Sequence, residues 1–142
     1  MCEYIALPWS KIIPAHRIPP RDCALIEPMS VGFHAVSRAQ VTDIDIVMVI
    51  GCGMIGMGAI VRSALRGATV IAVDLDDEKL ELAKRIGAHH TINSMTENVH
   101  ECLTKITEGL GPDVVIEAVG SPATYVMAVN EVGFTGRVVC IG

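Results

Sequence analysis

An open α/β fold, in which a parallel sheet carries helices on both faces, is predicted by three observations on this sequence. Short continuous apolar runs alternate with segments of helical spacing from residue 46 to the end of the chain. Hydrophobic residues make up 51% of the chain and aromatic residues only 4%, which suits close-packed parallel strands better than an aromatic-rich sandwich. The 142 residues can bury one good core, so we expect one domain.

The first 22 residues differ from the rest of the chain. They contain four of the seven prolines and only short apolar runs such as residues 4–7, which is typical of strand and extended connections. We therefore expect residues 1–22 to be the tail of a longer protein and residues 23–142 to form the domain. Apolar residues at helical spacing between 22 and 39 predict a helix there, with Pro28 as the place where it can bend.

Two strand–helix units follow. Residues 46–50 are uniformly apolar, which predicts a strand buried on both faces, and the small residues of 55–65 predict the helix after it. Residues 69–73 repeat the strand pattern. Residues 77–86 then predict a helix, because apolar side chains recur on one side of it at Leu80, Ala83 and Ile86.

Three shorter strands complete the predicted sheet, at residues 90–92, 114–116 and 137–141. Before the second of them, Thr96 is expected to cap an amphipathic helix that bears Val99, Leu103 and Ile106. Before the third, Ser121-Pro122 has the chemistry of a helix start. This alternation implies right-handed crossovers and a doubly wound sheet, with five of the six strands of a Rossmann fold present.

Charge and cysteine usage exclude several function classes. The formal charge of −5 comes from dispersed acids and no Lys/Arg run is present, which argues against nucleic acid as a partner. No stretch is apolar and long enough for a membrane span, and the first residues lack a secretory signal, so we expect a cytoplasmic protein. The five cysteines have no disulfide or zinc-knuckle spacing.

The turn Gly51-Cys52-Gly53-Met54-Ile55-Gly56 lies between a predicted strand and a predicted helix. In that context Gly51 allows the tight turn, Gly53 lets backbone approach a diphosphate, and Gly56 lets helix and strand pack closely. Free N–H groups at the helix start then provide an anion site. A tight turn without a ligand is the structural alternative. Cys52 is a candidate for oxidation at this helix start, although a merely small turn residue is the better explanation.

Asp74 follows the second strand, where the adenosine ribose of a dinucleotide would lie. Its carboxylate can accept hydrogen bonds from both ribose hydroxyls and would repel a 2′-phosphate, and no arginine follows it, so the sequence predicts NAD and not NADP. A helix cap or a solvated charge is the alternative role for Asp74.

With these motifs in view, the chain resembles the zinc-containing medium-chain alcohol and polyol (sorbitol-type) dehydrogenases. The resemblance lies in Glu27–Ala35, in Val49–Gly56, in Asp74 with Lys79-Leu80, Ala83 and Gly87-Ala88, and in Asp113–Gly120 and Gly136–Gly142. It implies a parent enzyme that transfers hydride between a secondary alcohol and NAD, with zinc as a Lewis acid. It also implies a homo-oligomer when full length and a small alcohol or polyol as substrate.

The resemblance further implies roles for single residues. Met54 and Ile55 would bind the cofactor with the glycines, Lys79 would assist Asp74 at the ribose, and Val119, Gly120 and Val31 would lie on the nicotinamide side. Glu27 falls where sorbitol-type members place an acid beside the catalytic zinc. A helix-start acid and a solvated lysine are the alternative roles for Glu27 and Lys79.

The family's upstream GroES-like catalytic domain, with its zinc ligands and its lobe of four cysteines, has no counterpart in this sequence. We therefore expect a fragment or a natural truncation that binds NAD without turnover, with residues 1–22 as the remnant of the catalytic domain. A stand-alone NAD-sensing module is the alternative. An adenosine-ligand enzyme such as a methyltransferase also uses a glycine turn and an acid, but the complete Gly51, Gly53 and Gly56 set favours a diphosphate.

Overall fold

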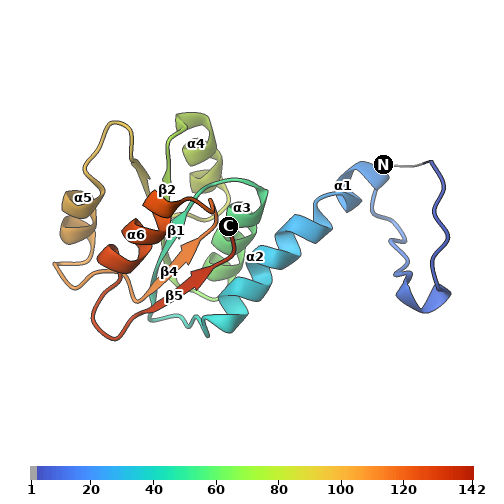
Figure 1. Cartoon of the computed structure of the whole chain (residues 1–142), viewed down its shortest axis with the longest axis horizontal. Helices are drawn as coiled ribbons and strands as arrows, with labels where there is room; N and C mark the ends of the chain where they lie inside the picture. The colour runs from blue at the N-terminus through green and yellow to red at the C-terminus, as the bar shows by residue number, and fades with distance from the viewer. Residues whose placement is uncertain (1–2) are drawn as a thin grey trace.

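Five parallel strands form one sheet in the spatial order β3-β2-β1-β4-β5, as a computed structural model that describes residues 3–142 shows (Figure 1). The doubly wound fold expected from the sequence is therefore confirmed. In chain order the elements are η1 (Trp9–Lys11), α1 (Pro20–Cys23), α2 (Ile26–Arg38), β1 (Ile46–Ile50), α3 (Met54–Leu65), β2 (Thr69–Asp74), α4 (Asp77–Arg85), β3 (His90–Asn93), α5 (Val99–Ile106), β4 (Val114–Glu117), α6 (Pro122–Glu131) and β5 (Arg137–Cys140).

The strand order reverses at β1, which pairs with β2 on one side and with β4 on the other. At the carboxyl end of β1, Ile50 stands in register with Val73 of β2 and with Glu117 of β4. The connections from β1 and from β4 leave toward opposite faces of the sheet at this point. Ligands of open α/β sheets bind in the crevice that such a reversal creates.

Two apolar clusters cover the two faces of the sheet, and neighbouring strand residues alternate between them. Val47 and Val49 of β1 belong to the cluster with α2, α3 and α4, whereas Met48 and Ile50 belong to the cluster with α5 and α6. A strand buried on both faces must be apolar at every position, and this is why residues 46–50 have no polar alternation.

Helices α2 and α3 pack closely through two glycines. A Cβ added to Gly32 of α2 would lie 2.4 Å from the backbone nitrogen of Ala59, and one added to Gly58 of α3 would lie 2.7 Å from the backbone oxygen of Met29. Because no side chain separates the two backbones, α2 lies against α3 beside the sheet (Figure 1).

The segment before α2 differs from the sequence prediction. Residues 3–19 contain the short helix η1 and no strand, and they run away from the sheet with their side chains exposed (Figure 1). The helix expected over 22–39 is two helices, α1 and α2, separated at Ala24 and Leu25. Pro28 does not bend α2, because it lies in the first helical turn, where the missing N–H costs no hydrogen bond.

Smaller corrections concern the ends of the other elements. Thr96 does not cap α5; the N-cap is Asn98, whose side chain accepts a hydrogen bond from the backbone N–H of Glu101. Strands β2 and β4 extend one residue beyond the predicted apolar runs and end on Asp74 and Glu117. Within residues 3–142, no helix is both long and apolar enough to cross a membrane.

Candidate functional site

A pocket of about 570 Å³ opens at the carboxyl ends of β1, β2 and β4, where the strand order reverses. Five residues predicted from the sequence to bind a cofactor line it: Gly51, Gly53, Asp74, Lys79 and Val119. Sequence reasoning missed the remaining wall, which α6 and the loops after β2 and β3 contribute. Leu75, Ser94, Thr124 and Met127 are examples, and no motif marks them, because the fold alone brings them here.

Each glycine of the turn after β1 has a different physical role. Gly51 has a φ of 93°, in the left-handed region that favours glycine. A Cβ on Gly56 would lie 1.8 Å from the backbone oxygen of Gly51, so only glycine fits there. A Cβ on Gly53 would meet nothing within 4 Å, and this residue faces the pocket. The chain thus keeps an open space at Gly53 that its own packing does not require.

The start of α3 also differs from those of the helices that follow later strands. In α4, α5 and α6 the N-cap side chains of Asp76, Asn98 and Ser121 accept hydrogen bonds from first-turn N–H groups. The N-cap of α3 is Gly53, and no side chain caps this helix. The first-turn amides, those of Met54 and Ile55 among them, therefore lack a side-chain acceptor and retain the partial positive charge of the helix dipole.

Asp74 occupies the end of β2 with its side chain only 10% exposed. Its Oδ1 accepts hydrogen bonds from the N–H groups of Leu75 at 2.8 Å and Asp76 at 3.1 Å. Its Oδ2 accepts one from the N–H of Cys52 at 2.6 Å, and this bond joins the carboxylate to the glycine turn. The Nζ of Lys79 lies 4.0 Å from Oδ1, so the two side chains that the resemblance pairs at a ribose do lie together.

A second turn, after β4, forms the wall opposite Asp74. Val119 lies across from the glycine turn, since a Cβ on Gly51 would come within 2.6 Å of the Val119 Cγ2. Gly120 follows with a φ of 82° and does not itself line the pocket. Both backbone N–H groups donate to the buried carboxylate of Glu117, a residue to which the sequence assigned no role.

Cys52 is a small buried residue and not a reactive thiol. It is 2% exposed, and burial together with the negative charge of Asp74 raises the pKa of its thiol to about 12. Thiolate is the reactive form, so the structure favours the small turn residue preferred from the sequence over a site of oxidation. The helix-start field cannot offset the loss of solvent and the adjacent carboxylate.

The residues of α2 do not join this pocket. Glu27 lies exposed in the first turn of α2, and Val31 is half-buried further along the same helix. Neither lines the pocket at the strand ends. Among residues 3–142, no three His, Cys, Asp or Glu side chains cluster closely enough to hold a metal ion.

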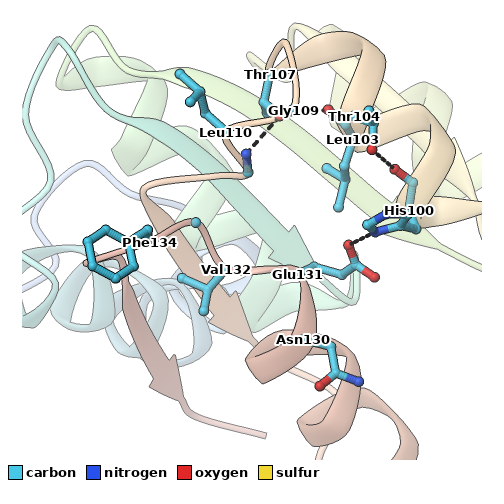
Figure 2. A pocket seen from close by; sticks show the side chains of 12 residues that line it. His100, Leu103, Thr104, Thr107, Gly109, Leu110, Asn130, Glu131, Val132 and Phe134 are labelled. Carbon is cyan, nitrogen blue, oxygen red and sulfur yellow. Dashed lines mark hydrogen bonds and ion pairs between the residues drawn. The ribbon is translucent and has the colours of Figure 1, made fainter.

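A smaller hollow of about 260 Å³ lies elsewhere, beside the loops that lead into β4 and β5. Figure 2 shows His100 of α5 directed toward Glu131 at the end of α6, with its Nδ1 2.9 Å from the Glu131 Oε2. Leu110 and Phe134, both largely exposed, complete the rim. None of the residues around this hollow belongs to the glycine turn or to the end of β2, so we place no cofactor there.

Fold and pocket together define an open α/β domain of the dinucleotide-binding type, with a glycine turn, an uncapped helix and an acid at the reversal of strand order. The chain belongs to the zinc-binding dehydrogenase family, whose model matches residues 55–142. The resemblance inferred from the motifs is thereby confirmed.

Individual relatives agree with this assignment. Erythritol/L-threitol dehydrogenase of Mycolicibacterium smegmatis is 36% identical over 147 residues, covering 100% of this chain and 40% of the relative. D-xylulose reductase of Scheffersomyces stipitis is 41% identical over 121 residues, covering 84% of this chain and 33% of the relative. The solved structure of alcohol dehydrogenase TADH from Thermus sp. ATN1 superposes with a TM-score of 0.84 at 34% identity, over 92% of this chain and 38% of that one. The chain thus spans two fifths or less of these proteins.

Proposed function

We propose that this chain is the NAD-binding domain of an alcohol or polyol dehydrogenase, which transfers hydride between a secondary alcohol and NAD. The observation that carries the proposal is the meeting of an uncapped helix start and a carboxylate in one pocket. The relatives named above are dehydrogenases or reductases of alcohols, polyols and related sugars. Hydride acceptance is the chemistry of the bound NAD, and the chain binds and orients it.

The residues of the pocket fit NAD. The amides of the first turn of α3 suit a diphosphate, and the empty space at Gly53 allows it to approach the backbone. Asp74 Oδ2 accepts one hydrogen bond and keeps a lone pair for a ribose hydroxyl. Lys79, half exposed beside Asp74, can donate to the same sugar. A 2′-phosphate would meet the Asp74 carboxylate, which favours NAD over NADP.

The described residues do not fit a catalytic zinc, because a catalytic site usually takes three protein ligands and no such cluster is present among residues 3–142. We therefore propose that this chain binds NAD without turnover, and that Glu27 approaches zinc only in a longer protein. The roles of Val31 and Gly120 at the nicotinamide, the cytoplasmic location, homo-oligomeric assembly and a catalytic-domain remnant over 1–22 stay predictions from the sequence.

Calorimetric titration of the 142-residue chain with NAD, NADP and S-adenosylmethionine tests the proposal. We expect NAD to bind and the other two to bind at least about tenfold more weakly, since one misplaced charge or lost charged hydrogen bond is worth more than 1.4 kcal/mol. A folded chain that fails to bind NAD contradicts the proposal. Preference for S-adenosylmethionine would instead support the methyltransferase alternative.

The variant Asp74→Asn tests the residue on which cofactor choice depends. We expect NAD affinity to fall about 10- to 100-fold, because a charged acceptor at the ribose is lost, and the preference over NADP to shrink. Asp76→Asn is the matched control: Asp76 caps α4 and does not line the pocket, so the affinity should stay within about threefold. An equal loss of NAD affinity in the Asp74→Asn and Asp76→Asn variants would mean that Asp74 has no contact with the cofactor.

A further inference from the structure

Glu117 is a fully buried acidic residue at the last position of β4. Its Oε1 accepts hydrogen bonds from the N–H of Val119 at 2.8 Å, from the N–H of Gly120 at 2.9 Å and from the hydroxyl of Thr124 at 2.8 Å. Its Oε2 is buried and has no hydrogen-bond partner within the described part of the chain. Three donors thus converge on one oxygen and none on the other.

Such an arrangement is a poor way to stabilise a core. Burying a carboxylate is costly unless donors satisfy both oxygens, and an apolar residue of similar volume would fill the same space without that cost. The other residues of β4, Val114, Val115 and Ile116, are apolar and fully buried. The acid at the end of this strand therefore has a role other than filling the core.

The contacts of Glu117 point to that role, because two of its three hydrogen-bond partners line the pocket at the strand ends. Val119 and Thr124 line this pocket, and Glu117 itself stands in register with Ile50, which also lines it. The left-handed φ of 82° at Gly120 allows two successive backbone N–H groups to face one oxygen. The carboxylate therefore links the turn after β4 to the first turn of α6.

The position of Val119 depends on this link. The N–H of Ala118 donates to the carbonyl of Ile50 at 2.9 Å, which holds the start of the turn to β1. Beyond that bond, the Val119 side chain is half exposed and abuts the glycine turn, where a Cβ on Gly51 would lie 2.6 Å from its Cγ2. The backbone of Val119 is fixed by its hydrogen bond to Glu117, so this bond sets where the wall of the pocket stands.

We propose that Glu117 is a positioning residue that preforms the Val119 wall of the cofactor pocket: its Oε1 fixes Val119, Gly120 and Thr124 before any ligand arrives. The identity of the ligand as NAD rests on the function proposed above. The proposal that Glu117 orders the turn does not depend on that function. A preformed wall strengthens binding because the ligand need not order the turn on arrival.

Three variants of the full 142-residue chain test this proposal. Glu117→Leu removes every acceptor, Glu117→Gln keeps a carbonyl oxygen that can accept from the same donors, and Glu117→Asp draws the carboxylate back by one methylene group. Asp45→Asn is the control for lost stability, since Asp45 is another buried carboxylate and lies before β1, away from the pocket. Amide hydrogen exchange at Val119 and Gly120 and the Kd for NAD are measured for each folded variant.

We expect Glu117→Leu and Glu117→Asp to speed exchange at both amides at least about tenfold and to raise the Kd for NAD about tenfold. In these variants the turn is no longer held in place, so binding must order it. Glu117→Gln should restore both values to within about threefold of the parent chain, and Asp45→Asn should change neither. If the Leu variant does not fold, the Asp variant decides. Unchanged exchange and Kd in a folded Leu or Asp variant would overturn the proposal. A parent chain that does not bind NAD would refute the proposed function, while the exchange rates would still decide the role of Glu117.

Discussion

Two glycines of the turn between β1 and α3 meet opposite surroundings, although both belong to one motif. At Gly56 the backbone oxygen of Gly51 occupies the space that a Cβ would need, at 1.8 Å. At Gly53 the same space is empty, and φ is −73°, which any residue can adopt. Gly56 is thus required by the fold, whereas the fold does not require a glycine at position 53, in keeping with the proposed approach of a ligand to the backbone there.

Alanine at each position separates the two requirements. We expect Gly56→Ala to lower the free energy of unfolding by more than about 3 kcal/mol, because overpacking against backbone cannot relax. Gly53→Ala should change stability by less than about 1 kcal/mol and weaken NAD binding at least about tenfold, because the new methyl group enters the diphosphate space. Urea unfolding and calorimetric titration measure the two effects. A Gly53→Ala chain that binds NAD as tightly as the parent would place the diphosphate elsewhere.

At the scale of the element, the helix starts divide into capped and uncapped ones. Side chains cap α4, α5 and α6, whereas α3 begins on a glycine at the pocket. A capping side chain stabilises a helix but occupies the N–H groups that could bind an anion. Among the helices that follow a strand within residues 3–142, α3 alone begins without a side-chain cap, and its start faces the pocket.

Asn98 and Thr96, both near the start of α5, allow a matched test of helix capping. Asn98→Ala should lower the free energy of unfolding by about 1 kcal/mol, because the side-chain acceptor for the Glu101 N–H is lost. Thr96→Ala should stay within about 0.5 kcal/mol, because Thr96 is exposed and lies outside the helix. Chemical denaturation of both variants measures the difference. The reverse order of losses would restore Thr96 as the cap.

At the scale of the whole molecule, a polar network joins the amino ends of three strands. Asp45, just before β1, accepts hydrogen bonds from the backbone N–H and the hydroxyl of Thr42 and forms an ion pair with Arg137 of β5. Asp113, just before β4, accepts a hydrogen bond from the N–H of Ile46 at 2.8 Å. The network lies at the opposite end of the strands from the pocket, so it serves assembly of the sheet.

The Asp45 carboxyl makes this network sensitive to acid. Burial alone would raise its pKa, but the hydrogen bonds from Thr42 and the hydrogen bond and charge of Arg137 together hold the pKa below its usual value. A group whose pKa is lowered on folding stabilises the fold above its unfolded pKa of about 3.9, and this contribution is lost as the pH falls through the lower folded value.

We expect Asp45→Asn to lower the free energy of unfolding by about 1 to 2 kcal/mol at pH 7, as for a hydrogen-bonded charge paired with a partly exposed arginine. The difference from the parent chain should stay constant down to about pH 5 and shrink below about pH 4. Denaturation series at several pH values measure it, with Asp43→Asn, at an exposed neighbouring position, as the charge-matched control. A difference that persists unchanged at pH 2 would contradict an origin in the Asp45 charge.

Much of the fold could be predicted from local patterns. The five strands, the helices that follow them, the glycine turn and Asp74 at a strand end all depend on residues that are neighbours in the chain. The same patterns misplaced the cap of α5 and joined α1 to α2, because several polar residues near a helix start can cap it and because apolar spacing alone does not show where a helix is interrupted.

By itself, then, the sequence determined the order and type of the elements and the glycine-rich form of the turn after β1, because hydrophobic period, turn chemistry and spacing act over a few residues. Only the tertiary structure decided which distant groups meet: Asp74 with the Cys52 N–H, Asp45 with Arg137, and Glu117 with the turn beside the pocket. Glu117 shows the physical reason. It ends an otherwise apolar strand, and its role depends on the folding of the turn and of α6 around its carboxylate.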